Sequence, residues 1–347
     1  MPILIGLGSP LLDISANVGS ELLDKYGLKE NGAVLIDQQN MDKFMPLEDE
    51  ILNLDSVVFL PGGSALNTIR VFQWVSNGIN GQKKADRAIF FGSVGNDSEA
   101  EMLLEKTVET GVEAKFQRIE RVRTGKCFSL INATNRSLCA CLGAASLFSL
   151  DFLHLPENAK LINTAKYFYS SAHFFTVCPE AIKHLATKAN ELERPFLFNL
   201  SADYIPGKFK KELNQIMPFV DILFANEMEA FAYAKANELN PTYHLHQIAL
   251  PTEEKRGGRI VLITRGEKPL IVAQNGTIKE FPVIFVDKIV DTNGAGDAFC
   301  GGFLAAFACD FSLENCVKFA LSAAATIVQN CGCTFPEEWD GECLERK

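Results

Sequence analysis

Asp291-Thr-Asn-Gly-Ala-Gly-Asp297-Ala-Phe299 joins an apolar, strand-like run to a segment in which Phe303 and Phe307 continue an apolar pattern at helical spacing. The stretch therefore predicts a helix that begins directly after a glycine-rich turn. Its two glycines, Gly294 and Gly296, let the backbone approach a ligand closely. The N–H groups at a helix N-terminus then point outward and bind anions. We therefore expect an anion site at this turn.

A carboxylate, Asp297, lies in the first turn of the same predicted helix. A carboxylate inside an anion site suits phosphoryl transfer, because it can take the proton of the attacking hydroxyl. Its ordinary pKa of about 3.9 makes it a weak base, which suffices if the proton leaves late in a loose transition state. The N–H groups of Gly294, Ala295 and Gly296 would stabilise charge on the transferring phosphate. The alternative is a simple turn, with Asn293 as a turn residue and Asp297 as a helix-start residue.

Around this stretch, apolar strand-like runs alternate with helical patterns along the 347 residues. This order is typical of a parallel sheet that helices cover on both faces. The expected strands are Ile3–Gly8, Ala88–Val94, Tyr167–Ser171, Phe196–Leu200, Ile222–Ala225 and Ile260–Thr264. The expected helices include Ser64–Ser76, Ser98–Thr110, Pro179–Asn190, Glu227–Ala236 and Ala295–Cys309. Asn237–Gly258 has mixed polarity and is expected to be a surface connection.

Two parts of the chain break this alternation and predict a second, smaller sheet. The first contains three short apolar runs, which are Leu11–Asn17, Ala33–Ile36 and Val57–Leu60. The second reads as a hairpin made of Lys126–Asn132 and Ser137–Leu142. We expect these pieces to form one small β-sheet that acts as a lid over the open end of the main sheet.

The composition favours a protein that acts on small molecules. The net charge of −10 argues against nucleic acid as the main partner. We expect no membrane span, because no apolar stretch is long enough, and the first residues read as a buried strand rather than a signal peptide. Ten cysteines without a signal peptide imply reduced thiols and a cytoplasmic protein. Cys139/Cys141 and Cys331/Cys333 are spaced too closely for the usual zinc sites.

Seven short motifs occur in an order and spacing that resembles one known family, the ribokinase-like (pfkB) sugar and nucleoside kinases. The signature of that family is D-T-x-G-A-G-D, as in Asp291–Asp297. The similarity runs from Gly6 to Glu337, nearly the whole chain, and is strongest to the branch that phosphorylates adenosine. The matching motifs are Pro61–Asn67, Thr124–Cys127, Asn135–Leu138, Phe174–Val177, Asn199–Ala202, Asp221–Glu229 and Asp291–Phe299.

The resemblance implies a three-layer ribokinase-like α/β fold with a mostly parallel central sheet and a small β lid. Residues 1–10, 63–115 and 145–347 would form the large nucleotide-binding domain, and 11–62 and 116–144 the lid. The implied reaction is ATP-dependent 5′-phosphorylation of adenosine to AMP, with Mg²⁺ bridging the phosphates. Another nucleoside or a ribose-like sugar is the first alternative as substrate. A non-catalytic nucleoside-binding protein on the same fold is the second. Members of the family are monomers or dimers, and we expect a monomer.

Several polar residues would serve the phosphates and the metal ion. Arg136, at the predicted hairpin turn of the lid, would swing onto the transferring phosphates when the lid closes, although a turn arginine is commonly only solvated. Asn226 and Glu229 would help to hold Mg²⁺ through water. Asn-x-x-Glu is equally a common helix start, with Asn as the cap. Thr264-Arg265-Gly266 matches the nucleotide-binding turn of the family, and Asn293 would contact either substrate or nucleotide.

The remaining candidates would bind adenosine. Asp13 would accept hydrogen bonds from both hydroxyls of the ribose 2′,3′-diol. Gly62, Gly63, Ser64 and Asn67, at the start of a helix, would bind the other sugar oxygens. Purines stack on apolar and aromatic groups, although such residues are as often ordinary core. The candidates for this base pocket are Ser9, Leu35, Cys127, Leu138, Leu142, Phe174 and Tyr204.

Two departures from the family pattern bear on selectivity. Ser9 stands where these kinases commonly have Asn, and a shorter side chain reaches fewer atoms of a purine edge. Leu321 stands in a region where they commonly carry Gly-His-Tyr. Both changes leave the choice among purine nucleosides and phosphate donors open, whereas neither touches Asp297 or its glycines.

Overall fold

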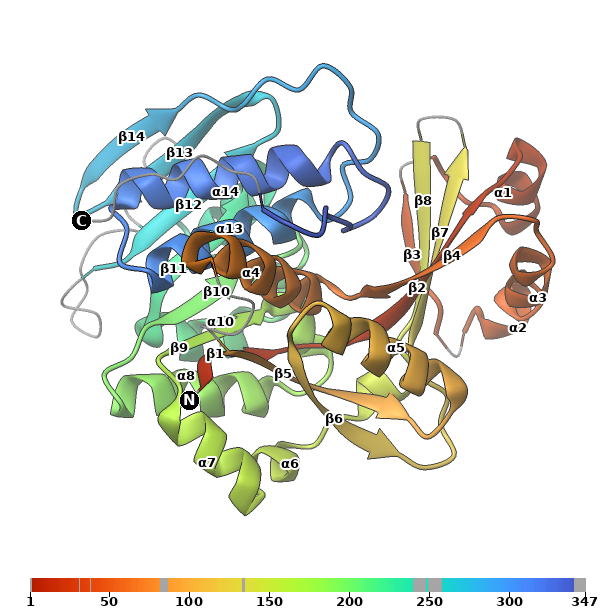
Figure 1. The fold of residues 1–347 in the computed structure, drawn as a ribbon, viewed down its shortest axis with the longest axis horizontal. Coiled ribbons are helices and arrows are strands. Elements are labelled where there is room, and N and C mark those ends of the chain that lie inside the picture. Colours follow the sequence, from red (N-terminus) through yellow and green to blue (C-terminus); the bar gives the residue numbers. More distant parts are fainter. Residues whose placement is uncertain are drawn as a thin grey trace.

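The computed structural model describes residues 2–339, apart from 31, 38, 82–86, 133–134, 240–247 and 249–257. A nine-stranded sheet forms the centre of the large domain, and a separate five-stranded sheet forms the lid (Figure 1). This architecture is the expected three-layer α/β fold with a mostly parallel sheet and a small β lid. Most of the expected surface connection 237–258 lies outside the described residues.

The central sheet has the strand order β14-β13-β12-β11-β10-β9-β1-β5-β6. All neighbours from β12 to β6 are parallel, and β13 and β14 add an antiparallel edge. The inner strands are continuous apolar runs because helices cover both of their faces. Their bounds are β1 Pro2–Leu7, β5 Arg87–Gly95, β6 Glu113–Ile119, β9 Tyr167–Ser171, β10 Phe196–Asn199, β11 Val220–Asn226, β12 Ile260–Arg265, β13 Lys268–Gln274 and β14 Thr277–Phe281.

Each face of the sheet has its own hydrophobic core. One face carries α4 (Ser64–Asn80), α5 (Ser98–Glu109), α13 (Ala295–Ala308) and α14 (Leu313–Ile327). The other carries α6 (Leu150–His154), α7 (Pro156–Thr164), α8 (Pro179–Glu191), α10 (Lys210–Ile216) and α11 (Glu227–Ala236). Helices α4 and α13 pack closely because Gly301 has no side chain, and a Cβ there would lie 2.6 Å from the Thr68 carbonyl oxygen. This contact fixes the relative position of the two helix starts.

The lid sheet has the order β3-β8-β7-β2-β4, from segments far apart in the chain. The strands are β2 Leu11–Asn17, β3 Ala33–Leu35, β4 Val57–Gly62, β7 Lys126–Asn132 and β8 Asn135–Cys141. Helices α1 (Ser20–Tyr26), α2 (Met41–Phe44) and α3 (Leu47–Leu52) cover its outer face (Figure 1). The alternate residues Leu12, Ile14 and Ala16 are buried in the lid's core, which leaves Asp13 and Ser15 on the opposite face of β2.

The predicted elements are confirmed, with ends that shift by a few residues. The strands β6, β13 and β14 were not predicted, nor were α14 and the shorter helices α1, α2, α3, α6, α7 and α10. β6 and β14 lie at the edges of the sheet and lack a continuous apolar run, which is the signal of a buried strand. We propose the same division into a large domain and a lid, with the boundary at 116 moved to the end of β6, because β6 pairs with β5. Among the described helices, none is both long enough and apolar enough to span a bilayer.

Candidate active site

Two helix N-termini meet at the edge of the sheet that faces the lid. Gly63 precedes α4 with φ 93°, and Gly294 precedes α13 with φ 78°, a backbone region that favours glycine. The Asp297 carboxylate lies between the two helices: it accepts hydrogen bonds from Ser64 Oγ at 2.6 Å and from Asn67 Nδ2 at 3.3 Å. The N-termini of α4 and α13, each preceded by a glycine, thus hold the Asp297 carboxylate between them.

The turn before α13 leaves room for an anion. The N–H of Ala295 bonds back to the Thr292 carbonyl oxygen at 3.3 Å, whereas no acceptor among the described residues takes the N–H of Gly296 or Asp297. A Cβ on Gly296 would meet no protein atom within 4 Å, so the space beside this backbone is open. Free N–H groups at a helix N-terminus next to open space are suited to binding an anion, so this turn remains the candidate anion site.

Burial changes the acidity of Asp297. The surrounding protein desolvates the carboxylate and raises its pKa from 3.8 to about 6, although the hydrogen bonds from Ser64 and Asn67 lower it. A carboxylate with this pKa is ionised at neutral pH and holds a proton more readily than an ordinary aspartate. These are the properties of a general base that works near neutral pH.

One row of the lid sheet carries three of the residues predicted for adenosine, Asp13, Leu35 and Cys127. Strand pairing aligns Leu35, Ala140, Cys127, Asp13 and Leu60 from β3 to β4, so these side chains share one face of the sheet. Cross-strand register therefore brings together residues that are far apart in the sequence.

Asp13 is held against the glycine turn that leads into α4. A Cβ on Gly62 would lie 2.0 Å from Asp13 Oδ1, so only glycine fits beside this carboxylate. Burial raises the pKa of Asp13 to about 7, and the positive charges of Arg136 and Arg70 oppose this shift. Gly63 is equally restricted, since its Cβ would lie 2.1 Å from the Ser9 carbonyl oxygen. The structure thus brings Ser9, Asp13 and both glycines together.

Arg136 of β8 lies across the same lid face and reaches the large domain. Its guanidinium bonds Ser15 Oγ at 2.9 Å, contacts Ser129, and forms an ion pair with Asp291. Both members of the pair are largely buried, with 11% and 9% of their side chains exposed. Burial lowers the pKa of Arg136, which nevertheless remains a cation. The lid arginine is thus placed beside the anion site, held by the first residue of the D-T-x-G-A-G-D motif.

Asp291 also organises the turn itself. It accepts the N–H of Asn293 at 2.9 Å and that of Gly332 at 2.7 Å. Asn293 therefore takes part in the turn through its backbone, as the simpler interpretation expected, and it is half-buried beside Gly294. The role of Asp291 was not predicted from sequence, nor were the contacts of Ser15 and Ser129. Period-two alternation along β2 and β7 would have placed both serines on the Asp13 face.

The residues predicted for the base pocket are only partly grouped. Cys127, Leu138 and Leu142 belong to one small apolar cluster with Leu11, Ala140 and Ala145. Leu35 and Tyr204 are 51% and 48% exposed and lie outside it. Phe174 packs in the core of the large domain, with its ring 5.5 Å from that of Phe148. The lid therefore supplies a compact apolar patch, whereas Phe174 lies behind the surface.

Asn226 and Glu229 form a complete capping box at the start of α11. The Asn226 side chain accepts the Glu229 N–H at 2.8 Å, and the Glu229 carboxylate accepts the Asn226 backbone N–H at 2.9 Å. Burial raises the pKa of Glu229 to about 7, and the charges of Asp203 and Asp297 add to the shift. The described residues contain no group of three His, Cys, Asp or Glu side chains arranged as metal ligands. A negative site whose side chains are already engaged fits a Mg²⁺ ion bound through water.

Thr264, Arg265 and Gly266 lie at the carboxyl end of β12, where Thr264 is the strand partner of Asn226. Arg265 turns toward its own hairpin, donating to the Pro269 carbonyl oxygen at 2.6 Å and pairing with Glu280 at 3.3 Å. Gly266 has φ 62° and open space where a Cβ would stand. Leu321 on α14 is half-buried against the core of this side. This edge of the sheet therefore lies open beside Asn226.

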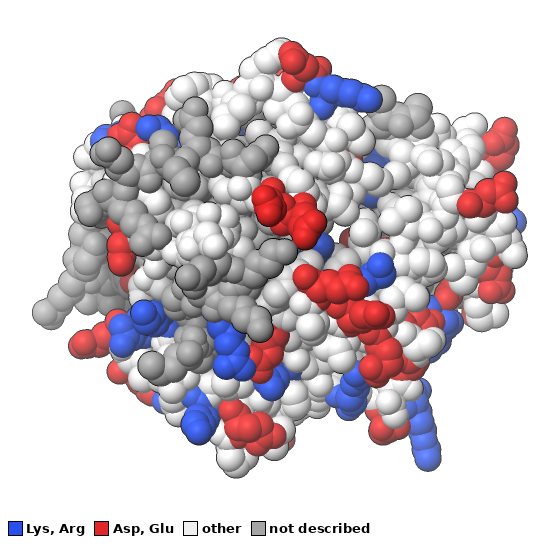
Figure 2. All heavy atoms as spheres, viewed as in Figure 1, with Lys and Arg blue, Asp and Glu red and all other residues white. Residues whose placement is uncertain are grey.

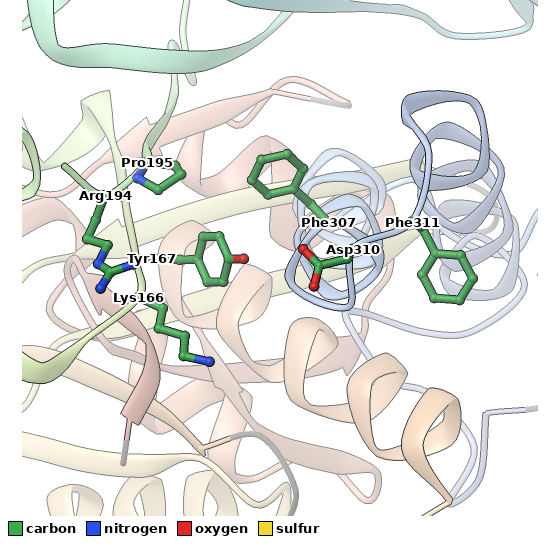
Figure 3. Close-up of a pocket in the computed structure, with 7 residues that line it drawn as sticks. All are labelled: Lys166, Tyr167, Arg194, Pro195, Phe307, Asp310 and Phe311. Carbon is green, nitrogen blue, oxygen red and sulfur yellow. The ribbon is translucent and has the colours of Figure 1, made fainter. Parts of the chain in front are cut away.

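The structure has a pocket of about 270 Å³ that lies away from these residues (Figure 3). Tyr167, Phe307 and Phe311 line it with Lys166, Arg194, Pro195 and Asp310. It lies at the last turn of α13, about 15 Å along the helix from Asp297, and contains none of the predicted residues. Figure 2 shows acidic and basic side chains mixed over one face of the molecule, with acidic ones gathered near α5.

Comparison with known proteins agrees with this geometry. Residues 22–340 match the family described as pfkB family carbohydrate kinase. Adenosine kinase 2 of Arabidopsis thaliana is 37% identical over 345 residues, covering 97% of each chain. Adenosine kinase of Saccharomyces cerevisiae is 38% identical over 339 residues, covering 96% of this chain and 97% of the relative.

Solved structures agree as well. Anopheles gambiae adenosine kinase in complex with P1,P4-di(adenosine-5) tetraphosphate has a TM-score of 0.83 at 38% identity, covering 95% of this chain and 96% of that one. Schistosoma mansoni adenosine kinase in complex with 2-fluoroadenosine has a TM-score of 0.85 at 30% identity, covering 96% and 97%. On the match of the family over most of its length, this chain belongs to the pfkB carbohydrate kinase family.

Proposed function

We propose that this chain transfers the γ-phosphoryl group of ATP to the 5′-hydroxyl of adenosine and thereby produces AMP. The observation that carries the proposal is the Asp297 carboxylate, held by Ser64 and Asn67 between two helix N-termini next to an open anion site. The full-length relatives that are adenosine kinases support the choice of substrate.

Adenosine lies between the lid and α4 in this proposal. Asp13 accepts the 2′- and 3′-hydroxyls, and the glycine-led start of α4 contacts the remaining sugar oxygens through Gly62, Gly63, Ser64 and Asn67. The base lies against the apolar patch of the lid. Ser9, Leu35, Cys127, Leu138, Leu142, Phe174 and Tyr204 are the residues assigned to it. The nucleoside is thus oriented with its 5′-hydroxyl toward Asp297.

Asp297 takes the proton of the 5′-hydroxyl as the oxygen attacks the γ-phosphorus. The bond from the attacking oxygen to phosphorus forms while the bond to the bridging oxygen of ADP breaks. The pKa of about 6 keeps the carboxylate ionised at neutral pH and still lets it hold the proton for a time. The N–H groups of Gly294, Ala295 and Gly296 stabilise the charge on the transferring group.

Arg136 exchanges its ion pair with Asp291 for the phosphates of ATP. A guanidinium donates to a carboxylate and to a phosphate with the same forked geometry, so phosphate oxygens can replace Asp291 as its acceptor when the lid closes. Asn226, Asn293, Thr264, Arg265 and Gly266 hold the nucleotide at the neighbouring strand ends. Mg²⁺, bound through water beside Asn226 and Glu229, would neutralise phosphate charge.

A kinase for another nucleoside or a ribose-like sugar is the first competing function, and Ser9 in place of the usual Asn is what favours it. A non-catalytic nucleoside-binding protein is less consistent with Asp297 and the open turn at Gly296. We also propose that the enzyme is a monomer without membrane partners. The net charge of −10 argues against nucleic acid as a partner, and the cysteine content favours the cytoplasm.

ATP consumption with adenosine, inosine, guanosine and ribose, measured side by side with and without Mg²⁺, tests the proposal. We expect adenosine to give the highest kcat/KM and chelation of Mg²⁺ to abolish turnover. A higher kcat/KM for ribose or guanosine would select the first competing function. Adenosine binding without ATP consumption would select the second.

A further inference from the structure

We propose that Arg70, a buried arginine on α4, is a positioning residue that acts on the base Asp297 through Asn67. The inference rests on the proposed function and extends it to a residue that does not touch the substrate. Arg70 lies one helical turn after Asn67, and both side chains are 4% exposed. Arg70 Nη1 donates to Asn67 Oδ1 at 3.2 Å, and Asn67 Nδ2 donates to Asp297 Oδ2 at 3.3 Å. The three groups form one chain of hydrogen bonds.

The donor properties of arginine fix the direction of this chain. A guanidinium has five N–H donors and no acceptor, so the amide of Asn67 must turn its oxygen toward Arg70. Its NH₂ group then faces the Asp297 carboxylate. Without Arg70 the amide could rotate and present its oxygen to the carboxylate, which would replace an attraction by a repulsion. Arg70 therefore determines that the NH₂ group of Asn67, and not its oxygen, faces Asp297.

The charge of Arg70 strengthens the same bond. Among the described residues Arg70 forms no ion pair; the titratable groups whose charge acts on it are Cys333 and Asp13, and its Nε is buried without a hydrogen-bond partner. A buried cation of this kind is costly unless neighbouring dipoles compensate for it. The Asn67 amide is such a dipole, and a cation at its oxygen end makes its N–H groups stronger donors. The ionised form of Asp297 benefits from this polarisation, whereas the protonated form benefits less.

Arg70 also joins three parts of the active site. The same Nη1 donates to the carbonyl oxygen of Pro61 at 3.0 Å, where β4 of the lid meets α4, and to that of Cys333 at 3.2 Å. Cys333 packs behind the anion site, because a Cβ on Gly294 would lie 2.9 Å from the Cys333 Cβ. The guanidinium lies 5.2 Å from the ring of Phe335 in the same segment. Arg70 thus fixes the base relative to the end of the lid and the back of the anion site.

The test compares Arg70→Met, Arg70→Lys and a matched control, Arg259→Met. Arg259 is also buried, at 7% exposure, and donates to the Met217 carbonyl oxygen at 2.9 Å on the other face of the sheet. The readout is the pH profile of the single-turnover rate at saturating adenosine and ATP, with adenosine affinity and melting temperature measured for each variant. We expect Arg70→Met to move the acidic limb upward by about half to one pH unit and to lower the rate at neutral pH up to about tenfold. Arg70→Lys should restore part of the shift, and Arg259→Met should change only the melting temperature.

A second pair of variants asks whether Arg70 acts through Asn67. In an Asn67→Leu background the amide is gone, so the additional Arg70→Met or Arg70→Lys change should leave the acidic limb unmoved. An equal shift with and without Asn67, or a loss of melting temperature with an unchanged pH profile, would overturn the inference. If Arg70→Met does not fold, Arg70→Lys in both backgrounds decides the question. An inactive wild type would instead contradict the proposed function itself.

Discussion

Two charged junctions join the lid to the large domain, and they are built differently. In the hinge junction, Lys126 Nζ at the start of β7 bonds Glu48 of the lid at 2.5 Å and Glu99 of α5 at 2.7 Å. Arg123 bonds the same two carboxylates at 2.9 Å each. In the catalytic junction, Arg136 meets one carboxylate, that of Asp291. Arg136 pairs with Ile131 in the lid sheet, about 17 Å along β7 from Lys126.

The difference follows from what each junction has to do. In the hinge junction two cations share two carboxylates, so no charge is left for a ligand, and we propose that this pairing persists when the lid closes. In the catalytic junction a single guanidinium is bound to a residue of the anion-site turn, so phosphate oxygens can compete for it. In the proposed mechanism the lid stays attached at Lys126 while Arg136 exchanges its partner, so Arg136 would contact the phosphates only when a substrate is present.

Removal of the base should have the largest effect, and it should not depend on either junction. We expect Asp297→Asn to lower turnover by at least about 10²-fold while adenosine affinity stays near that of the wild type, because positioned acid–base groups contribute on this scale. Single-turnover kinetics and calorimetry measure the two quantities. The control is Asp287→Asn, at an exposed aspartate four residues before the first residue of the motif, Asp291. Near wild-type turnover in Asp297→Asn would remove Asp297 from the mechanism.

Substitution of Arg136 in the catalytic junction should lower kcat and leave adenosine affinity nearly unchanged. We expect Arg136→Met to lower kcat by about 10- to 100-fold and to change adenosine affinity only slightly, because the cation stabilises charge that develops in the transition state. Asp291→Asn should lower kcat less, since it frees Arg136 but loosens the turn that Asp291 holds. An unchanged kcat with a raised KM in Arg136→Met would make the arginine a binding residue only.

The hinge junction should show the opposite pattern. Lys126→Met leaves two carboxylates without their shared buried cation, so we expect a loss of about 3 kcal/mol in the free energy of unfolding and kcat near the wild-type value. Urea denaturation and steady-state kinetics provide the measurements. Lys188→Met, which breaks the exposed pair with Glu191, should cost about 0.5 kcal/mol or less. If Lys126→Met lowered kcat as much as Arg136→Met does, the two junctions would not differ in function.

The catalytic rate and the stability of the fold should decline over different ranges of pH. The pKa of Asp297 is raised to about 6, so the base is lost as pH falls through 6, and we expect the chemical rate to drop about tenfold per unit below that point. Burial raises the pKa of Glu99, but hydrogen bonds from Lys126, the backbone and Arg123 together lower it to about 2. A lowered pKa stabilises the fold above the ordinary value of 4.5 and loses this contribution only as pH falls toward 2. Circular dichroism near pH 5 should therefore show a folded and nearly inactive protein, whereas unfolding in parallel with the activity loss would contradict this separation.

The smallest effect is expected at the base pocket, away from both junctions. Ser9→Asn should sharpen the preference for adenosine over other purine nucleosides by a factor consistent with about one neutral hydrogen bond, roughly 1 kcal/mol. An amide offers a donor and an acceptor to a purine edge, and a hydroxyl is shorter. The ratio of kcat/KM values for adenosine and two analogues in both proteins measures this. An unchanged ratio would show that Ser9 does not recognise the base.

The sequence by itself determined most of the strands and helices and the glycine-rich turn at the start of α13. The glycines of the D-T-x-G-A-G-D stretch predicted an open turn before α13. Glycine allows unusual backbone angles and leaves the backbone accessible to a ligand. Apolar runs predicted the inner strands, since a strand that is covered on both faces needs no alternation. β14 was not predicted because four of its five residues are exposed and it has no apolar run. Its pairing with β13, and not a hydrophobic pattern of its own, defines it as a strand.

The tertiary structure decided which distant groups meet. Asp297 and Ser64 are 233 residues apart in the chain, and Arg136 and Asp291 are 155 apart. Their contacts depend on how closely α4 packs on α13 and on the register of the lid strands, which no local pattern specifies. The same holds in part for Arg70: its bond to Asn67 is local to α4, whereas its hydrogen bonds to Pro61 and Cys333 come from two other parts of the fold. Local backbone preferences act over a few residues, whereas the charges that position the base and the lid are brought together only by packing.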